Sequence, residues 1–393
     1  MPWEAAKVPT GCNVPSSRLA TGRKCLHGTS GLVIPAGTPR LFRSPCVSAP
    51  KFPQRKYASG NGKPQPANAL FATSLMTNLL FTDPGNPAPE NATAGFFAAG
   101  DRKKLRYALF RTATRPFRGT IVLIQGRNEF IEKYFETVRD LAAAGFDVAT
   151  FDLRGQGLSD RLLKNRRRGH VRRFDDYVSD LDRFLKDIVL PDCAGPFSVL
   201  AHSTGGLIAL LAAPALTNSI VRMVLSAPLL GLYGVRTASI RRLSGFMRLM
   251  GAGGLPLARE RRPEPADSFS KNVLTSDAAR FARNTAVAAA HPELALGAPT
   301  AGWLHATCVA AQRVQQSEFA ARIHVPTLLI AAGADKVVST PAIEAYTRRL
   351  RSGSLMVIDG ARHEILQEAD LYREQFLAAF KAFIPEEEPP PSG

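Results

Sequence analysis

From about residue 93 onward, short apolar runs alternate with helical patterns of apolar residues. This alternation is typical of a mostly parallel sheet, because parallel strands need a crossover connection that is usually a helix. The apolar runs predict strands over residues 93–99, 105–112, 119–125, 147–152, 196–202, 220–226, 326–332 and 354–358. We therefore expect an α/β fold with a mostly parallel eight-stranded sheet flanked by helices.

Helical patterns fill the gaps between several of these runs. One helix is expected to begin near Phe130 and to stop at Gly145, because glycine readily adopts the left-handed conformation that ends helices. A second is expected to begin at Asp175, and a third to have Thr340 as its N-cap and Pro341 at its first position. The last helix carries an aromatic stripe formed by Tyr372, Phe376, Phe380 and Phe383. These apolar stripes are expected to face the core.

The alternation lapses over residues 228–320, a long, arginine-rich stretch of helical composition. This stretch separates two apolar runs that should be neighbours in the sheet, so an inserted helical cap is the economical explanation. The predicted core is then made of residues 76–227 and 321–385. The acidic, proline-rich end, residues 386–393, is expected to be a disordered tail.

The leading segment, residues 1–75, is rich in Pro, Gly, Ser and Arg and shows no helical or strand periodicity. It contains ten basic residues against a single acid, Glu4, and lacks the apolar stretch of a secretory signal. We interpret it as a disordered leader; a second interpretation has the native protein begin at Met76. Its prolines oppose a transit-peptide helix, and its basic residues lack the aromatic interleaving of a nucleic-acid-binding segment. Nucleic acid is therefore not expected as a partner.

The composition narrows the class of protein. With 45% hydrophobic and 21% charged residues the chain can bury a sizeable core, which excludes a wholly disordered or fibrous protein. The most apolar stretch, residues 198–216, is interrupted by polar side chains, so no membrane-spanning helix is predicted.

Five cysteines without a C-x-x-C pair support neither a disulfide framework nor a zinc site. Metal-ligand spacing is also lacking at His170, His291, His305 and His324. We expect a cytoplasmic protein without metal or cofactor.

The strongest local signal is an apolar strand that runs into a turn of small residues and then into an apolar helix, at residues 197–213. A nucleophile elbow needs this arrangement, because its serine occupies a strained turn that admits only small residues two positions to either side. The serine here is Ser203, and its small neighbours are Ala201 and Gly205. Ala201 departs from the usual G-x-S-x-G pattern by one methyl group. His202, directly before the serine, is expected to pack or to form hydrogen bonds.

A serine hydroxyl becomes a nucleophile only with a base to take its proton and an acid to orient that base. In an elbow protein these follow along the chain in the order Ser, acid, His. Asp335 follows one predicted strand and His363 follows the next. We therefore predict Ser203, Asp335 and His363 as the catalytic residues. Asp359 is the competing acid, but its early position in the loop suggests a turn.

Acyl transfer also needs two donors for the oxyanion. The first is expected to be the main-chain N–H of Thr204, directly after the serine. The second is expected to be the main-chain N–H of Arg127, because Gly126 permits the sharp turn that points it inward. The alternative is an ordinary strand-to-helix loop in which Asn128 or Glu129 caps the helix.

These residues together resemble the serine-hydrolase branch of the α/β-hydrolase superfamily that includes bacterial lysophospholipases and monoacylglycerol lipases. The resemblance covers about residues 90–385, and its further motifs are Gln125-Gly126 with Glu129 and Tyr134, Phe151–Ser159, Gly169–Val171, Phe174–Val178, Leu274–Asp277, Arg280–Arg283 and His291–Leu294. It implies an α/β-hydrolase fold with a cap and hydrolysis of monoacyl lipid esters. Ala201 departs from the branch, and so does Gln125, which stands where the branch usually has histidine.

The predicted cap contributes the substrate expectation. Between Leu229 and Arg262 it has seven arginines and one acid, and an apolar helical stripe is formed by Ile240, Leu243, Met247 and Met250. Such a helix can lie on an anionic membrane surface, or it can offer its apolar face to an acyl chain while arginine holds a phosphate. A solvated charged face is the third interpretation. We expect a small-molecule or monoacyl lipid ester as substrate, a lysophospholipid among the candidates, and peripheral membrane contact through the basic cap. The oligomeric state stays open.

Three alternatives compete with this prediction. A carboxylesterase or serine aminopeptidase that acts on small soluble substrates would use the same three residues. A noncatalytic binding protein of the same fold would have no need of Ser203, Asp335 and His363 together. Dehalogenases and many epoxide hydrolases use aspartate at the elbow, and Ser203 argues against them.

Overall fold

A computed structural model describes residues 79–257 and 269–384 of the 393-residue chain. The predicted leader, residues 1–75, and the predicted tail, residues 386–393, lie outside the described residues. So does the short stretch 258–268 within the predicted cap.

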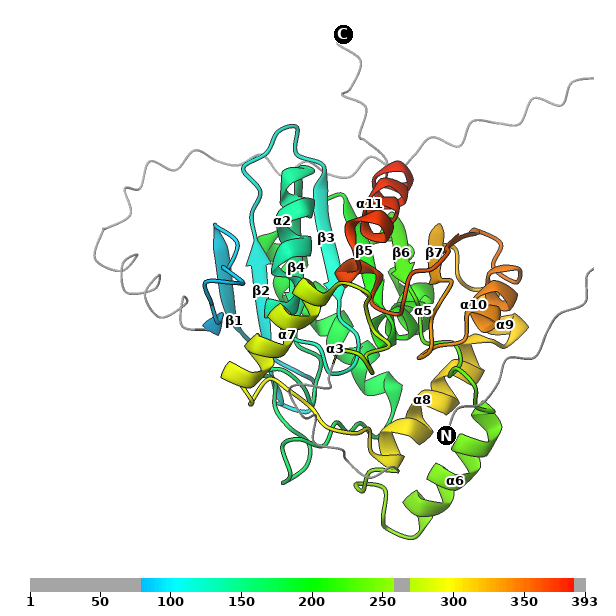
Figure 1. The fold of residues 1–393 in the computed structure, drawn as a ribbon. Helices are drawn as coiled ribbons and strands as arrows, with labels where there is room; N and C mark the ends of the chain where they lie inside the picture. Colours follow the sequence, from blue (N-terminus) through cyan, green and yellow to red (C-terminus); the bar gives the residue numbers. More distant parts are fainter. Residues whose placement is uncertain (1–78, 258–268, 385–393) are drawn as a thin grey trace, which may run out of the picture. The chain divides into compact units, whose positions relative to one another are not determined.

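The eight strands form one sheet in the order β1-β2-β4-β3-β5-β6-β7-β8 (Figure 1). Their bounds are Ala92–Ala98 for β1, Lys104–Phe110 for β2, Gly119–Ile124 for β3, Phe146–Phe151 for β4, Phe197–His202 for β5, Arg222–Ser226 for β6, Thr327–Ala332 for β7 and Gly353–Ile358 for β8. The pairs β1–β2 and β2–β4 are antiparallel, and the strands from β4 to β8 run parallel. The predicted fold and all eight predicted strands are confirmed.

The central strands are covered on both faces, which explains why they are apolar throughout rather than alternating. All six residues of β3 are buried. Ile121 and Leu123 pack on one face with α2 (Phe135–Ala143) and α11 (Asp370–Phe383). Val122 and Ile124 pack on the other face, with the helices α3 (Phe174–Phe184), α5 (Thr204–Leu216) and α10 (Thr340–Thr347). The sheet therefore lies between two helical layers.

The helices begin and end close to their predicted residues, with one correction. A 3-10 turn, η2 (Ile131–Tyr134), leads into α2, and Gly145 follows with a φ of +90°. The N-cap of α10 is Ser339 rather than the predicted Thr340, because the Ser339 side chain accepts the hydrogen bond from the Ala342 N–H. Thr340 is therefore the first helical residue and Pro341 the second, not the first as predicted, and the Thr340 hydroxyl donates to the carbonyl of Ala332. Smaller elements are a π-helical turn η3 (Leu185–Val189), α4 (Leu190–Asp192) and a 3-10 turn η4 (Ile365–Gln367).

We call residues 227–326, between β6 and β7, the insertion; it contains the predicted cap. Its helices are α6 (Thr237–Leu249), α7 (Ala278–Ala290), α8 (Ala301–Val314) and α9 (Ser317–Ala320). Helix α8 packs against α5 and α6 (Figure 1). Helix α7 contacts η2. No helix in the described ranges combines the length and apolar character needed to cross a bilayer.

Candidate active site

Ser203 lies in a strained turn between β5 and α5. Its φ of +50° and ψ of −110° are unusual for a residue with a side chain, and such strain persists only where the surroundings enforce it. Two hydrogen bonds hold the turn: the Ser203 N–H donates to the Ser226 carbonyl, and the Leu229 N–H donates to the Ser203 carbonyl. The elbow is therefore tied to the end of the neighbouring strand β6.

The neighbours of the elbow must be small because another loop packs against it. A Cβ atom at Gly205 would lie 2.3 Å from the carbonyl oxygen of Ile124 and 2.6 Å from that of Gln125. No side chain is accommodated at such distances, so position 205 requires glycine. The methyl group of Ala201, in contrast, is buried within the apolar core on the α5 side of the sheet.

The structure brings Ser203, Asp335 and His363 together at the carboxyl edge of the sheet. The His363 Nε2 atom lies 3.0 Å from the Ser203 Oγ atom, and the His363 Nδ1 atom lies 2.7 Å from an Asp335 carboxylate oxygen. All three residues are buried. Because a carboxylate only accepts hydrogen bonds, Nδ1 carries the proton and Nε2 is left to accept the one from serine. Asp359, the competing acid, is exposed.

The second oxygen of Asp335 is also engaged. Its Oδ1 atom accepts the N–H groups of Val337, at 2.7 Å, and Val338, at 2.9 Å. These two amides fix the rotation of the carboxylate, so Oδ2 points at His363. Strands β7 and β8 are parallel neighbours, which is why the loops that follow them meet.

The loop after β3 is not an ordinary helix cap. The side chain of Asn128 accepts the N–H of Leu296 in the insertion, and Glu129 turns inward, so neither residue caps η2. The carboxylate of Glu129 accepts hydrogen bonds from the main-chain N–H of Gly126, from the Tyr134 hydroxyl at 2.6 Å and from the Lys133 ammonium at 3.0 Å. The contact with Gly126 holds the turn that precedes Arg127.

A buried charged cluster adjoins the serine through the preceding residue, His202, and consists of Glu129, Lys133, His202 and Glu364. The Lys133 ammonium bridges Glu129 and Glu364, the latter at 2.6 Å. His202 has Glu129 at 3.1 Å from Nδ1 and the main-chain carbonyl of His363 at 3.2 Å from Nε2. Since both ring nitrogens face acceptors, both must carry protons to form these bonds, and His202 is then a cation. The expectation that His202 forms hydrogen bonds agrees with this geometry.

The pKa values of Glu129 and His202 shift in the directions that this arrangement requires. Burial opposes a charged His202, but the Glu129 carboxylate outweighs it and raises the pKa of His202 above its usual value. Burial likewise opposes a charged Glu129, yet Lys133 and His202 lower the pKa of Glu129 well below its usual value. The cluster is thus ionised and self-neutralising. Sequence reasoning missed Lys133 and Glu364, because charged residues 231 positions apart give no local signal of their pairing.

Ser203 opens into a cavity of about 970 Å³ between the core and the insertion. Part of its lining is apolar and comes mainly from the insertion, through Leu232, Phe281, Ala288, Leu296, Trp303 and Leu304. Part is polar, through Arg127, Glu129, Lys133, Arg167, Asn284 and Glu364. The cavity therefore offers both a surface for a hydrocarbon chain and a set of charges.

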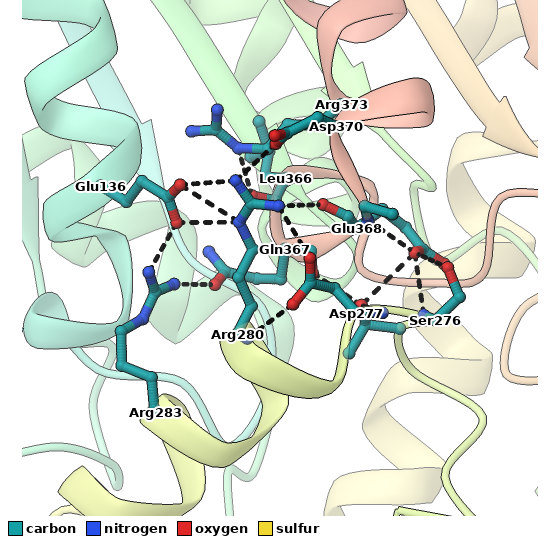
Figure 2. A network of polar contacts seen from close by, with 12 residues as sticks. Glu136, Ser276, Asp277, Arg280, Arg283, Leu366, Gln367, Glu368, Asp370 and Arg373 are labelled. Carbon is teal, nitrogen blue, oxygen red and sulfur yellow. Dashed lines mark hydrogen bonds and ion pairs between the residues drawn. The ribbon is translucent and has the colours of Figure 1, made fainter. Parts of the chain in front are cut away.

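The loop that carries His363 is joined to the insertion by a buried carboxylate, Glu368 (Figure 2). One oxygen of Glu368 accepts the Arg362 N–H at 2.8 Å, and the other accepts the Ser276 N–H at 2.8 Å. The Glu364 N–H also donates to the Leu274 carbonyl at 2.7 Å. The segment that leads into α7 is therefore hydrogen-bonded on both sides of the histidine.

Two arginines of α7 extend this network to the core (Figure 2). Arg280 and Arg283 both donate to the Glu136 carboxylate on α2, at 2.7 Å and 2.6 Å. Although partial burial opposes it, these arginines lower the pKa of Glu136 to about 2. Helix α7 is thus anchored to a core helix as well as to the histidine loop.

Comparison with known proteins agrees with this fold. The model of the family described as serine aminopeptidase, S33, matches residues 115–370, more than half of the chain. The chain belongs to this family of α/β-hydrolases. Solved structures with a similar fold include a soluble variant of monoglyceride lipase from Saccharomyces cerevisiae in complex with a substrate analogue. Its sequence identity with this chain is 20% and its TM-score is 0.60, and the match covers 76% of this chain and 95% of the lipase. Another is the monoacylglycerol lipase of Paleococcus ferrophilus, with 22% identity and a TM-score of 0.56 over 72% and 99%.

Curated relatives are more similar in sequence than these structures. Lysophospholipase L2 of Escherichia coli (strain K12) is 33% identical over 309 residues, which cover 73% of this chain and 86% of the relative. The probable lysophospholipase L2 of Haemophilus influenzae is 28% identical over 289 residues, which cover 73% and 91%. The similarity thus spans most of both chains.

Proposed function

We propose that this protein is a serine hydrolase that cleaves the carboxylic ester of monoacyl lipids through an acyl-enzyme on Ser203. The observation that carries the proposal is the placement of the Ser203 Oγ atom 3.0 Å from the His363 Nε2 atom, at the wall of a cavity with both apolar and charged lining. The names of the curated relatives, lysophospholipases, support the same substrate class.

In the proposed first step, the Ser203 oxygen attacks the ester carbonyl while His363 takes the hydroxyl proton. A bond forms between the Ser203 oxygen and the acyl carbon, and the carbonyl becomes an oxyanion. When the intermediate collapses, the bond between the acyl carbon and the alcohol oxygen breaks, and His363 returns the proton to the departing alcohol. In the second half, His363 takes a proton from the water molecule whose oxygen bonds to the acyl carbon. The bond between the acyl carbon and the Ser203 oxygen then breaks, His363 returns the proton to the Ser203 oxygen, and the fatty acid leaves.

The proposed oxyanion donors are the main-chain N–H groups of Thr204 and Arg127. Thr204 is the first residue of α5, whose early N–H groups have no partner within the helix. In the described part of the chain, neither of the two N–H groups donates to a main-chain acceptor. Both are therefore available to a ligand, and each such donor is worth roughly 100- to 1,000-fold in rate.

Ser203→Ala tests the mechanism. We expect release of fatty acid from monoacyl lipids to fall by at least about 10⁴-fold, because the hydroxyl is the group that forms the covalent bond. Labelling by a fluorophosphonate probe, followed by mass spectrometry, should place the adduct on Ser203 in the wild-type protein. Ser239→Ala, at an exposed serine of α6, is the matched control. Undiminished turnover by Ser203→Ala, or an adduct elsewhere, would contradict the mechanism.

The substrate panel separates the proposal from its nearest rival. Monoacylglycerols and lysophospholipids should be turned over with higher kcat/KM than short p-nitrophenyl esters or aminoacyl amides, because only a long chain fills the apolar part of the cavity. A preference for aminoacyl amides would instead favour a serine aminopeptidase.

We further propose that α6 makes peripheral contact with a membrane surface. Three of its apolar side chains are exposed, Leu243 at 51%, Phe246 at 62% and Leu249 at 83%. Arg242 and Arg248 lie on the same helix. Exposed apolar groups beside cations favour the interface of an anionic bilayer. A larger fraction of the Ser203→Ala protein should therefore sediment with anionic vesicles than with neutral vesicles. Equal fractions with both types of vesicle would contradict the role of the arginines.

A further inference from the structure

The side chain of Arg127 is a cation without a carboxylate partner in the described structure. Its guanidinium donates to the Gly297 carbonyl and lies over the ring of Trp303, 5.4 Å from the centroid. A Cβ atom at Gly169 would lie 3.4 Å from its Nη2 atom, so the guanidinium lies close to the main chain there. The Nε–H is enclosed and has no hydrogen-bond acceptor among the described atoms. An enclosed cation with an unused donor is costly unless something else completes its coordination.

Other buried cations of the core are neutralised. Arg106 pairs with Glu132 and Asp152, both at 2.7 Å. Arg154 pairs with Asp180 at 2.5 Å. Arg127 differs from them because it lines the substrate cavity, where a ligand can supply the missing negative charge.

The carboxylates of the cavity are not available to Arg127. Glu129 is engaged by Tyr134 and Lys133, and Glu364 by Lys133. These groups and His202 form the self-neutralising cluster described above. The positive charge of Arg127 is therefore not balanced by the acids that share its cavity.

A second arginine reaches the same place. Arg167 also lines the cavity, and its main-chain carbonyl accepts the N–H of Gly297 at 2.7 Å. Gly297 is the residue whose own carbonyl accepts the Arg127 guanidinium. One glycine of the insertion thus ties Arg127 and Arg167 to each other. Two guanidinium groups are the usual means of holding a phosphate, because each presents a planar fork of donors.

We infer that Arg127 and Arg167 form a subsite for the phosphate of the substrate's head group, so that a lysophospholipid is preferred over a monoacylglycerol. The inference rests on the proposed function. If the main-chain N–H of Arg127 holds the oxyanion, its guanidinium lies one arginine side chain away from the ester. That length is comparable with the glycerol that separates ester from phosphate in a monoacyl glycerophospholipid. Stacking on Trp303 holds the guanidinium plane in place before the lipid arrives.

The test compares kcat/KM for 1-hexanoyl lysophosphatidylcholine and 1-monohexanoylglycerol, both below their micellar concentrations, so that surface binding does not contribute. We expect the wild-type protein to prefer the phospholipid. The variants Arg127→Gln and Arg167→Gln should each reduce the ratio of the two kcat/KM values by about 10- to 100-fold, the range expected for a lost hydrogen bond to a charged group. Arg166→Gln, which removes the same charge from an exposed neighbour outside the cavity, should leave the ratio within about twofold.

The outcomes are distinguishable. A wild-type preference for the monoacylglycerol, or a parallel loss on both substrates in Arg127→Gln and Arg167→Gln, overturns the phosphate subsite and leaves Arg127 as a tie between the β3 loop and the insertion. A protein that hydrolyses neither lipid, although a fluorophosphonate labels Ser203, overturns the proposed function instead. A selective fall in the phospholipid rate, restored in part by Arg127→Lys, supports the subsite.

Discussion

Helices α6 and α7 belong to the same insertion but are attached to the core in opposite ways. Helix α7 is held by ion pairs to Glu136, and the segment before it is hydrogen-bonded to the loop of His363. Helix α6 packs against α8, and its side chains at Phe246 and Leu249 are exposed. The insertion therefore has one half that is anchored to the core by charged groups and another half that exposes apolar side chains beside arginines.

The two halves of the insertion therefore have separate roles, one in positioning the histidine and the other in contact with a lipid surface. The segment that leads into α7 fixes the position of the histidine, because Leu274 accepts the N–H of Glu364 and Ser276 shares the Glu368 carboxylate with the N–H of Arg362. The exposed side chains of α6 contribute little to packing and are available for contact with a lipid surface. We therefore expect substitutions that break the contacts of α7 to alter stability and turnover. Substitutions on α6 should alter only the binding of the protein to a membrane surface.

The largest effect is expected at Glu368. Glu368→Ala removes the buried carboxylate that accepts the Arg362 and Ser276 N–H groups through partly buried hydrogen bonds, and each donor left unsatisfied costs about 1–3 kcal/mol. We expect the free energy of unfolding, measured by urea titration, to fall by roughly 3 kcal/mol, and fluorophosphonate labelling of Ser203 to slow. The exposed Glu374 on α11 provides the control substitution, Glu374→Ala. Wild-type stability and labelling in Glu368→Ala would break the link between α7 and the histidine loop.

A smaller effect is expected at Glu136. Glu136→Gln removes the charge that binds Arg280 and Arg283, with a loss of about 1–2 kcal/mol near neutral pH, since these bonds are only partly buried. Because the folded-state pKa of Glu136 is lowered to about 2 from a usual 4.5, its contribution is fully present above pH 4.5 and is lost as the pH falls toward 2.

The measurement is urea unfolding of the wild-type protein and of Glu136→Gln at several pH values. Their difference in stability should shrink between pH 4.5 and pH 2. A difference that stays constant over this window would show that Glu136 acts by packing rather than by charge.

The smallest effect on stability is expected on α6. Phe246→Ser and Leu249→Ser should each change the free energy of unfolding by no more than about 0.5 kcal/mol, as is usual for exposed positions. In the same variants, sedimentation with anionic vesicles should decrease. A large loss of stability would mean that the outward half of the insertion is also part of the core, and the contrast between the two helices would fail.

The sheet and the arrangement of Ser203, Asp335 and His363 could be predicted because both leave local patterns. A buried strand is visible in the sequence as an apolar run. Once that run is identified, the residues at the carboxyl end of the strand are identified with it. His363 and Asp335 were found in this way, each after its own strand. The N-cap of α10 was placed one residue late, since adjacent Ser339 and Thr340 are both good caps and only the structure shows which hydroxyl faces the free N–H.

The charged contacts could not be predicted, because they join residues far apart in the chain. Arg106 lies in the apolar strand β2 and pairs with Glu132 and Asp152, although an isolated arginine in a strand suggests a solvent-facing position. Lys133 and Glu364 likewise read as ordinary surface charges. The anchoring of α7 joins α2, which carries Glu136, the loop that carries Glu368, and the insertion. No periodicity in the sequence links these three segments.

The two amides that hold Asp335 also decide what an asparagine would do there. Its single oxygen would stay with the N–H groups of Val337 and Val338, and its NH₂ group would face the imidazole. His363 would then accept at Nδ1 and keep its proton at Nε2, the wrong tautomer for deprotonating an alcohol. Asp335→Asn, a substitution outside the lining of the cavity, would thus exchange the donor and acceptor nitrogens of the imidazole. Hydrolysis would be lost although the fold is unchanged.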